Sequence, residues 1–312
     1  MTLTVIPYRN LLLFVTLAAV WGTAFMAINL GLEFFPPVTF AAIRYDVAGV
    51  LMLAYAVWVL DDPIPRGREQ WLLVGIGATF LIAGYHSLLF IGQSDPAVTS
   101  AIAAVIVSLS PILTTAFARV LLPSDRLTLV GIVGLVFGFV GVVVLSNPDP
   151  SNLTGEGTIA KLLVLAAAFA FAFGSVLTRR MEADLPIEAL EAWAMLLGGL
   201  LMHVVAFGLG ESLGDVQLTT EAIAALVYLA VVASAIGFLI YFDLLDRLGP
   251  VEINLVSYVA PVFAAIAGWL VLAEGISVTT VVGFGLIFVG FVLIKRDAIR
   301  AELTKRRLTA AE

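Results

Sequence analysis

The sequence has no cysteine and little charge, and both absences restrict what the protein can be. Without cysteine, the chain forms no disulfide and offers no thiolate to a metal. Only 12% of the 312 residues are charged while 61% are hydrophobic, which leaves too little charge to cover the surface of a water-soluble domain. The composition therefore predicts a protein that crosses the membrane several times.

Several functional motifs are also missing. The sequence holds no P-loop, no potassium-channel filter, no Gly-x-Ser-x-Gly and no His-Glu-x-x-His. Its two histidines lie far apart, at His86 and His203. We therefore expect no ATP hydrolysis, no enzyme activity, no cofactor and no metal site. The basic C-terminal segment is interpreted as a topology anchor, with no nucleic-acid partner.

Ten apolar stretches are long enough to cross a hydrocarbon core that needs about 20 helical residues. The connections between them carry Pro, Gly and Asp, and we expect Pro96, Pro186 and Pro250 each to begin a helix. The first stretch is too long for the core of a signal peptide, so we expect it to be retained. The predicted spans are 10–32, 38–60, 70–92, 96–121, 127–146, 158–179, 187–210, 220–246, 250–273 and 278–296.

Lysine and arginine predict the orientation of these spans. If the N-terminus is cytoplasmic, 14 of the 16 basic residues lie on the cytoplasmic side. The two others are Arg44, within the second span, and Lys161, at the outer end of the sixth. We therefore expect a multi-pass protein of the plasma membrane with both termini in the cytoplasm.

The chain repeats itself. Gly131 and Gly138, which follow one proline-containing span, match Gly283 and Gly290, which follow another, with the same seven-residue separation. Dividing the chain into 1–150 and 151–312 gives five spans to each copy. Because five is odd, the second copy enters the membrane inverted. The predicted fold is all-α, with ten transmembrane helices arranged as two inverted five-helix repeats around a central cavity.

Both copies resemble a known family. The stretch WGTAFMAINLGL, followed by PPVTFAAIRYDVAGVLML, resembles the start of an EamA domain, and YFDLLDRLGPVEINLVSYVAPVFAAIAGWLVLAEGIS resembles its end. The resemblance is to the drug/metabolite transporter superfamily, and it implies a carrier of small metabolites. One departure is visible: the second copy carries Leu-Ala-Glu at 272–274, whereas the first has Leu-Pro-Ser at 122–124, without the acid.

Polar residues inside the spans are the candidate site, because each one is costly in the membrane. Arg44 lies about 10 Å along the second span and could bind a substrate carboxylate or phosphate or take part in gating. Its structural alternatives are to extend outward to the membrane surface or to pair with Glu33. His86 could contact substrate, pass a proton or make an interhelical hydrogen bond. Thr79 shares its helical face with His86 by spacing, so we expect both to point inward.

Two further spans carry matching prolines. Asn254 and Tyr258 share a face with Pro261, and Ser108 has the corresponding place near Pro111. We expect the asparagine, tyrosine and serine to contact substrate and the two prolines to act as hinges, although proline in a membrane helix also occurs for packing alone. The remaining candidates for the cavity wall are Trp21, Asn29 and Glu191.

The leading interpretation is a secondary carrier of small organic metabolites, most of all amino acids, that works by alternating access and exports its substrate. Coupling to protons or other ions and a homodimer are open alternatives, the latter through the glycine-rich fifth and tenth spans. Efflux of drugs or lipophilic cations is a second function. A membrane receptor or lipid-modifying enzyme is a third.

Overall fold

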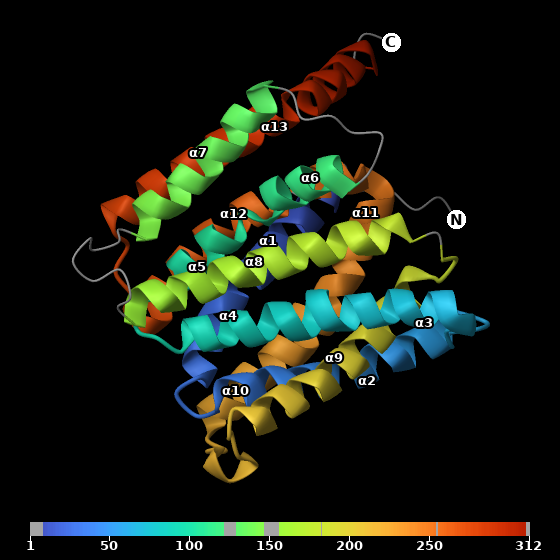
Figure 1. The fold of residues 1–312 in the computed structure, drawn as a ribbon, viewed down its shortest axis with the longest axis vertical. Helices are drawn as coiled ribbons and strands as arrows, with labels where there is room; N and C mark the ends of the chain where they lie inside the picture. The colour runs from blue at the N-terminus through green and yellow to red at the C-terminus, as the bar shows by residue number, and fades with distance from the viewer. Residues whose placement is uncertain (1–8, 122–128, 147–155, 182, 254, 310–312) are drawn as a thin grey trace.

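The protein is a bundle of helices (Figure 1). The computed structural model describes residues 9–121, 129–146, 156–181, 183–253 and 255–309, and every regular element within these ranges is helical. Seven of the helices are long and apolar enough to cross a membrane, and three shorter apolar helices cover Leu129–Leu145, Val256–Leu272 and Val278–Ile294. The predicted all-helical membrane protein is confirmed.

The helices of the first half follow the order of the predicted spans. They are α1 (Arg9–Gly31), α2 (Pro37–Val59), α3 (Gly67–Ile76), the π-helical η1 (Gly77–Gly84), α4 (Tyr85–Gln93), α5 (Ser100–Val107), α6 (Ser110–Leu121) and α7 (Leu129–Ser146). The predicted third span is thus one continuous helix with a π-helical middle, and the fourth is divided into α5 and α6.

The second half is also made of helices in the order of the predicted spans. Its helices are α8 (Glu156–Arg180), α9 (Ile187–Gly208), the short η2 (Leu213–Asp215), α10 (Thr220–Val227), the π-helical η3 (Tyr228–Ile236), α11 (Gly237–Ile253), α12 (Val256–Leu272) and α13 (Val278–Thr309). As in the first half, one span contains a π-helical segment, here between α10 and α11.

Two predicted helix starts are wrong. The fourth span begins at Ser100 and not at Pro96, because the Thr99 hydroxyl accepts the Ile102 amide and caps the helix there. Pro250 begins no helix, since α11 continues to Ile253. A proline so close to a helix end costs the helix only one hydrogen bond. Pro186 does mark a start, directly before Ile187.

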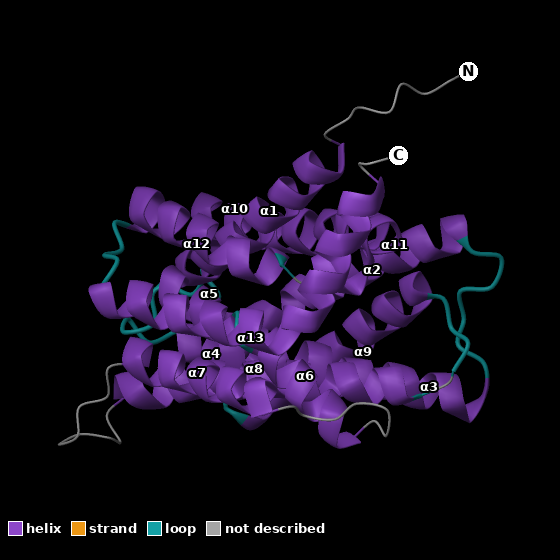
Figure 2. Ribbon diagram, turned by 90° about the horizontal axis from the view of Figure 1, so that it is seen from above, coloured by secondary structure: helices purple, strands orange, loops and turns teal. Residues whose placement is uncertain are grey.

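The first helix of each half packs against the opposite half. Helix α1 contacts α10, η3, α11 and α12, whereas α8 contacts η1, α4, α5 and α6. Figure 2 shows these groups as two layers, with α1, α10, α11 and α12 on one side and α4, α6 and α8 on the other. The interface between the two layers is therefore formed by helices from both halves.

Two helix pairs close the edges of these layers. Helices α2 and α9 pack together along one edge, and α7 lies along α13 at the other (Figure 1). The second pair is close because a Cβ on Gly134 would meet the Gly290 carbonyl oxygen at 2.6 Å, and one on Gly141 would meet that of Gly283 at 2.7 Å. These glycines thus allow α7 and α13 of the same chain to pack closely.

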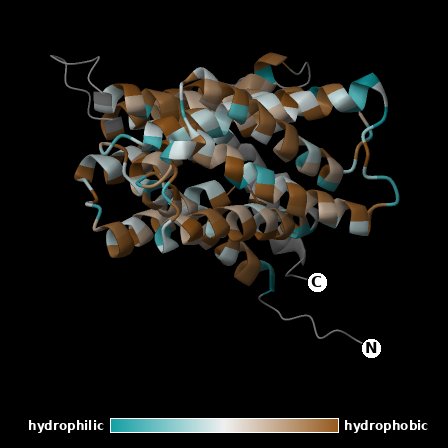
Figure 3. Cartoon of the chain, turned by 90° about the horizontal axis from the view of Figure 1, so that it is seen from below, coloured by the Kyte–Doolittle hydropathy of each residue, from teal (hydrophilic) through white to brown (hydrophobic). Residues whose placement is uncertain are grey.

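The outer surface of the bundle suits lipid. Hydrophobic residues run along the helices, while hydrophilic residues gather at helix ends and connections (Figure 3). Large apolar side chains such as Val136, Val140, Leu200 and Val204 are exposed on the outside. In water such a surface would drive aggregation, whereas in a bilayer it faces hydrocarbon.

Candidate functional site

Arg44 lies buried between the layers. It sits seven residues into α2, and its side chain is 6% exposed. Its Nε donates to the Ser234 hydroxyl of η3 at 3.2 Å, and its guanidinium carbon lies 5.0 Å from the centre of the Tyr45 ring. Within the described residues it forms no ion pair with a carboxylate, so the expected alternative pairing with Glu33 does not occur.

Tyr45 and His86 form a buried pair beside this arginine. The Tyr45 hydroxyl lies 2.6 Å from His86 Nε2, and His86 Nδ1 lies 2.9 Å from the Ile82 carbonyl oxygen. Because a carbonyl only accepts, Nδ1 carries the proton and Nε2 accepts from the tyrosine. The protein itself thus occupies both ring nitrogens, which is the interhelical role that the sequence left open for His86.

Trp21 fixes the π-helical segment η3 from the side of α1. Its indole nitrogen donates to the Ala233 carbonyl at 3.1 Å, and its ring packs against Phe238 and Tyr241 with centroid distances of 5.8 and 5.5 Å. Nearby, the Thr23 hydroxyl lies 2.5 Å from that of Tyr228. Trp21 therefore supports the segment that supplies Ser234 to Arg44.

The two π-helical segments occupy corresponding places in the two halves. Gly77 and Tyr228, their first residues, are as far apart in sequence as Gly131 and Gly283 to within one residue. Such segments are rare and often occur at functional sites. Here η3 contributes Ser234, and η1 leads directly into Tyr85 and His86. The site thus lies where the regular helical winding changes in both halves.

The same winding removes Thr79 from the site. The 3.6-residue period places it on the face of His86, yet Thr79 is exposed on the outside of the bundle, in a shallow apolar groove of about 240 Å³ with Leu197 and Val204 of α9. It lies within η1, whose wider turns rotate it away from His86. The expected common face holds only from Ala83 onward.

Glu191 lies near the start of α9, the helix that packs along α2. It sits in the second turn of α9, is half-buried and is close enough to Tyr45 and Tyr241 to influence both electrostatically. It forms no ion pair with the described residues. A cationic and an anionic side chain therefore both lie near Tyr45.

Ser108 and Pro111 lie at the interruption between α5 and α6. The Ser108 hydroxyl donates to the Val105 carbonyl at 2.6 Å. Proline leaves the carbonyl four residues before it unpaired, and the Ser110 hydroxyl donates to that carbonyl, of Val107, at 2.7 Å. The fourth span is thus interrupted beside its proline, whereas α12 continues through Pro261.

Of the other two candidates of the ninth span, the structure describes Tyr258, which makes no contact with Arg44 among its hydrogen bonds and ring contacts. Tyr258 is buried against α13, with its ring centroid 4.3 Å from that of Phe291, and its hydroxyl has no hydrogen-bond partner among the described residues. Asn254 lies outside the described residues.

Asn29 lies in a polar cluster at one end of the bundle. Helices α1 and α4 end there and α5 begins; we name it the outer end, because the distribution of Lys and Arg predicts that it faces away from the cytoplasm, and the opposite one the inner end. Asn29 donates to Glu274 Oε1 at 2.9 Å and accepts from Gln93 at 2.6 Å. Ser100 donates to Glu274 through its hydroxyl at 2.9 Å and its amide at 3.0 Å. We call these four residues the Glu274 cluster.

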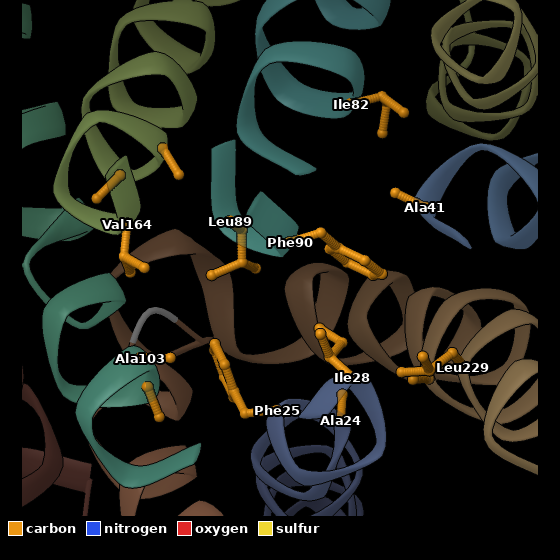
Figure 4. Packing of buried hydrophobic residues seen from close by; sticks show 14 of the residues in the cluster. Ala24, Phe25, Ile28, Ala41, Ile82, Leu89, Phe90, Ala103, Val164 and Leu229 are labelled. Atoms are coloured by element: carbon orange, nitrogen blue, oxygen red, sulfur yellow. The ribbon is translucent and has the colours of Figure 1, made fainter. Parts of the chain in front are cut away.

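An apolar layer separates the Glu274 cluster from Arg44. Phe25 and Ile28 of α1 point toward Leu89 and Phe90 of α4 (Figure 4), and these four side chains are 8, 2, 2 and 0% exposed. The Phe25 carbonyl also accepts a hydrogen bond from Gln93 at 3.0 Å, which ties the layer to the cluster. The outer end is therefore closed by packed side chains and by hydrogen bonds.

Several residues of the site were missed from the sequence. Tyr45 and Ser234 contact His86 and Arg44, but a lone tyrosine or serine in an apolar span carries little signal. Glu274 was noticed only as a difference between the repeats. Among the described residues, no three His, Asp or Glu side chains gather in a way that could hold a metal ion.

The chain is similar to known transporters over nearly its whole length. The sequence profile described as the EamA-like transporter family matches residues 9–147 and again 158–296. An uncharacterized inner membrane transporter of Escherichia coli K12, YedA, is 30% identical over 88% of this chain and 87% of its own. An uncharacterized transporter of Archaeoglobus fulgidus is 29% identical over 88% and 95%. One crystal structure, 24% identical, has a TM-score of 0.66 and covers 94% of this chain and 99% of its own, which supports the fold.

Proposed function

Because the chain belongs to the EamA-like transporter family, we propose that it is a secondary carrier that exports small organic metabolites, amino acids above all, by alternating access. The two halves, 1–150 and 151–312, act as inverted repeats and both termini lie in the cytoplasm. The exchange of α1 and α8 between halves and the corresponding positions of η1 and η3 support this arrangement.

Arg44 is the observation that carries the proposed substrate class. Burying a guanidinium within a membrane is costly unless its charge is compensated. Its five N–H groups form a fork that matches a carboxylate, yet the described protein accepts only from Nε. A substrate carboxylate would satisfy the remaining donors and the charge together. The site is therefore suited to carboxylate-bearing solutes.

Glu191 supports an amino acid over a simple carboxylate. It lies nearer the inner end, beside Tyr241, and has no basic partner within the described structure. An ammonium group arriving from the cytoplasm would meet this carboxylate and the aromatic rings of Tyr241 and Trp21 first. The carboxylate of the same substrate would then reach Arg44. Solutes that carry both charges suit both side chains in turn.

The half-buried Glu191 also keeps efflux of lipophilic cations as a second function. A cation would bind Glu191 and the aromatic rings, but Arg44 would repel it. The two functions therefore differ in which side chain they require. Cation efflux requires Glu191 and tolerates loss of the Arg44 charge, whereas export of amino acids loses its carboxylate contact in Arg44→Ala.

Flux through proteoliposomes of purified protein tests the proposal. We expect saturable flux of one or more amino acids, and an imposed pH gradient will reveal whether protons are coupled. Arg44→Ala should lower flux of carboxylate-bearing solutes by about ten- to a hundredfold, since a charged hydrogen-bonded contact contributes about 1.5–3 kcal/mol. Flux of neutral solutes should change far less.

The matched control is Arg68→Ala, because Arg68 is exposed at the start of α3. It should leave all fluxes unchanged. Equal loss of charged and neutral solutes in Arg44→Ala would show a structural role for the arginine. Folded protein without flux of any solute would favour the receptor or enzyme. Size measurement in the same detergent tests a homodimer, for which the lipid-facing sides of α7 and α13 are available.

A further inference from the structure

We propose that Glu274 is a positioning residue of the transport cycle: its carboxylate holds the outer end closed by joining the end of α12 to α1 and α5, and its release is a required step of opening to the outside. The proposal rests on the alternating access proposed above. It gives a role to the glutamate of Leu-Ala-Glu at 272–274, at the place where the first repeat has Leu-Pro-Ser.

The carboxylate of Glu274 is bound by donors from two other helices. Asn29, near the end of α1, donates to Oε1 at 2.9 Å, and the Ser100 hydroxyl donates to the same atom at 2.9 Å. The Ser100 amide, the first of α5, donates to Oε2 at 3.0 Å. The negative charge thus lies at the positive N-terminal end of α5, where it is stabilised.

The backbone around Glu274 is shaped for this contact. Ala273 adopts φ 54° and ψ 29°, the left-handed region that a residue with a side chain rarely enters, and thereby turns the chain back at the end of α12. The Glu274 amide then donates to the Gly268 carbonyl at 3.1 Å. A Cβ on Gly268 would overlap Glu274 Oε2, so only glycine leaves room for the carboxylate there.

The apolar layer beneath explains why this contact controls access. Phe25 and Ile28 belong to α1, the helix that carries Asn29, and Leu89 and Phe90 belong to α4, which carries Gln93. Opening a path from outside to Arg44 requires α1 and α4 to separate. Gln93 of α4 donates to Asn29 and to the Phe25 carbonyl of α1, and Glu274 holds Asn29 in place for the first of these bonds by accepting from its amide nitrogen.

Glu211 offers a matched comparison. Like Glu274, it follows a helix that ends at the outer end, and it also accepts three hydrogen bonds: from the Val38 amide at 3.0 Å, the Thr39 amide at 2.7 Å and the Thr39 hydroxyl at 2.8 Å. However, it joins α9 to α2, two helices that already pack along their length. Removing Glu211 should therefore weaken the protein without opening a path.

The absence of cysteine makes access measurable with one introduced thiol. Ala24→Cys places it on the inner side of the apolar layer at a buried position of α1, with little change in volume. A membrane-impermeant thiol reagent is added to one face of oriented vesicles at a time. Relative to Ala24→Cys alone, adding Glu274→Ala should raise the labelling rate from the outer face about tenfold, the change expected when a hydrogen bond to a charged group is lost.

Glu211→Ala in the same background should leave that rate unchanged. Three outcomes would overturn the proposal: a labelling rate that Glu274→Ala leaves unchanged, a rate that Glu211→Ala raises equally, or a rate that Glu274→Ala raises only from the inner face. Gly268→Ala keeps every charge but displaces the Glu274 carboxylate, so it should also raise the labelling rate from the outer face. If Glu274→Ala fails to fold, Glu274→Gln takes its place and should raise that rate by a smaller factor. Labelling requires no substrate, so its outcome stands apart from that of the flux experiment.

Discussion

The two ends of the bundle are built differently. At the outer end, Phe25, Ile28, Leu89 and Phe90 exclude water beneath a cluster of hydrogen-bonded polar side chains. Toward the inner end, Trp21, Tyr241 and Glu191 are each only half-buried. One end thus has the dense packing of a protein core, whereas the other keeps large polar and aromatic groups partly exposed.

Under the alternating access proposed above, this difference indicates which contacts the transport cycle would exchange. A carrier that alternates has to break the packing at its closed end and form comparable packing at the other. The outer end is the closed one here, so its contacts stabilise this state relative to the opposite one. Substitutions at the outer end should therefore alter stability and access most, and substitutions at the inner end should alter them less. Substitutions where α2 packs along α9, which we call the α2–α9 seam, should alter them least.

The largest effect is expected from Phe90→Ala. Phe90 is fully buried in the apolar layer, and removing such a ring typically costs about 3–5 kcal/mol. Thermal unfolding in detergent should therefore begin at a clearly lower temperature. The control is Phe207→Ala, because Phe207 is 85% exposed near the end of α9 and should change stability little. Equal losses in the two variants would show that the outer end is no better packed than the lipid-facing surface.

The proline variants come next. Pro111→Ala restores an amide beside the interruption between α5 and α6 and should favour one continuous helix, so we expect about tenfold slower turnover, or about 1.4 kcal/mol. Pro261→Ala should slow turnover less, because α12 is already continuous. Concentration-dependent flux separates turnover from affinity, which both variants should keep. Lost affinity with unchanged turnover would contradict a hinge role.

The sequence locates Arg44 but not the residues that contact it or the ones that close the outer end. Arg44 could be located because a charge inside an apolar span is conspicuous, but its partner Ser234 lies in the other half, and only tertiary packing brings the two together. Thr79 was misplaced because the 3.6-residue period fails inside η1. The inward turn of Glu274 depends on the left-handed Ala273, a conformation that alanine does not suggest.

At the inner end, Trp21→Phe should have a moderate effect. Phenylalanine keeps an aromatic ring against Phe238 and Tyr241 but leaves the Ala233 carbonyl without its donor, at a cost of about 1 kcal/mol. We expect a small loss of thermal stability and slower flux. Trp58→Phe is the control, since Trp58 is 81% exposed at the end of α2. If both substitutions behave alike, the indole hydrogen bond does not support η3.

The smallest effect is expected between the two ends, at the seam of α2 and α9. His203 Nε2 lies 2.7 Å from Asp46 Oδ2, with side chains 36 and 41% exposed. Hydrogen bonds between membrane helices contribute about 0.6 kcal/mol on average. A double-mutant cycle with Asp46→Ala and His203→Ala should give a coupling energy of about that size.

Flux should persist in both single variants of this seam, because α2 and α9 pack along their length and have no reason to separate as access alternates. A coupling energy above about 2 kcal/mol, or loss of flux with retained stability, would mean that the seam moves during transport. The contrast between a moving outer end and a static edge would then have to be abandoned.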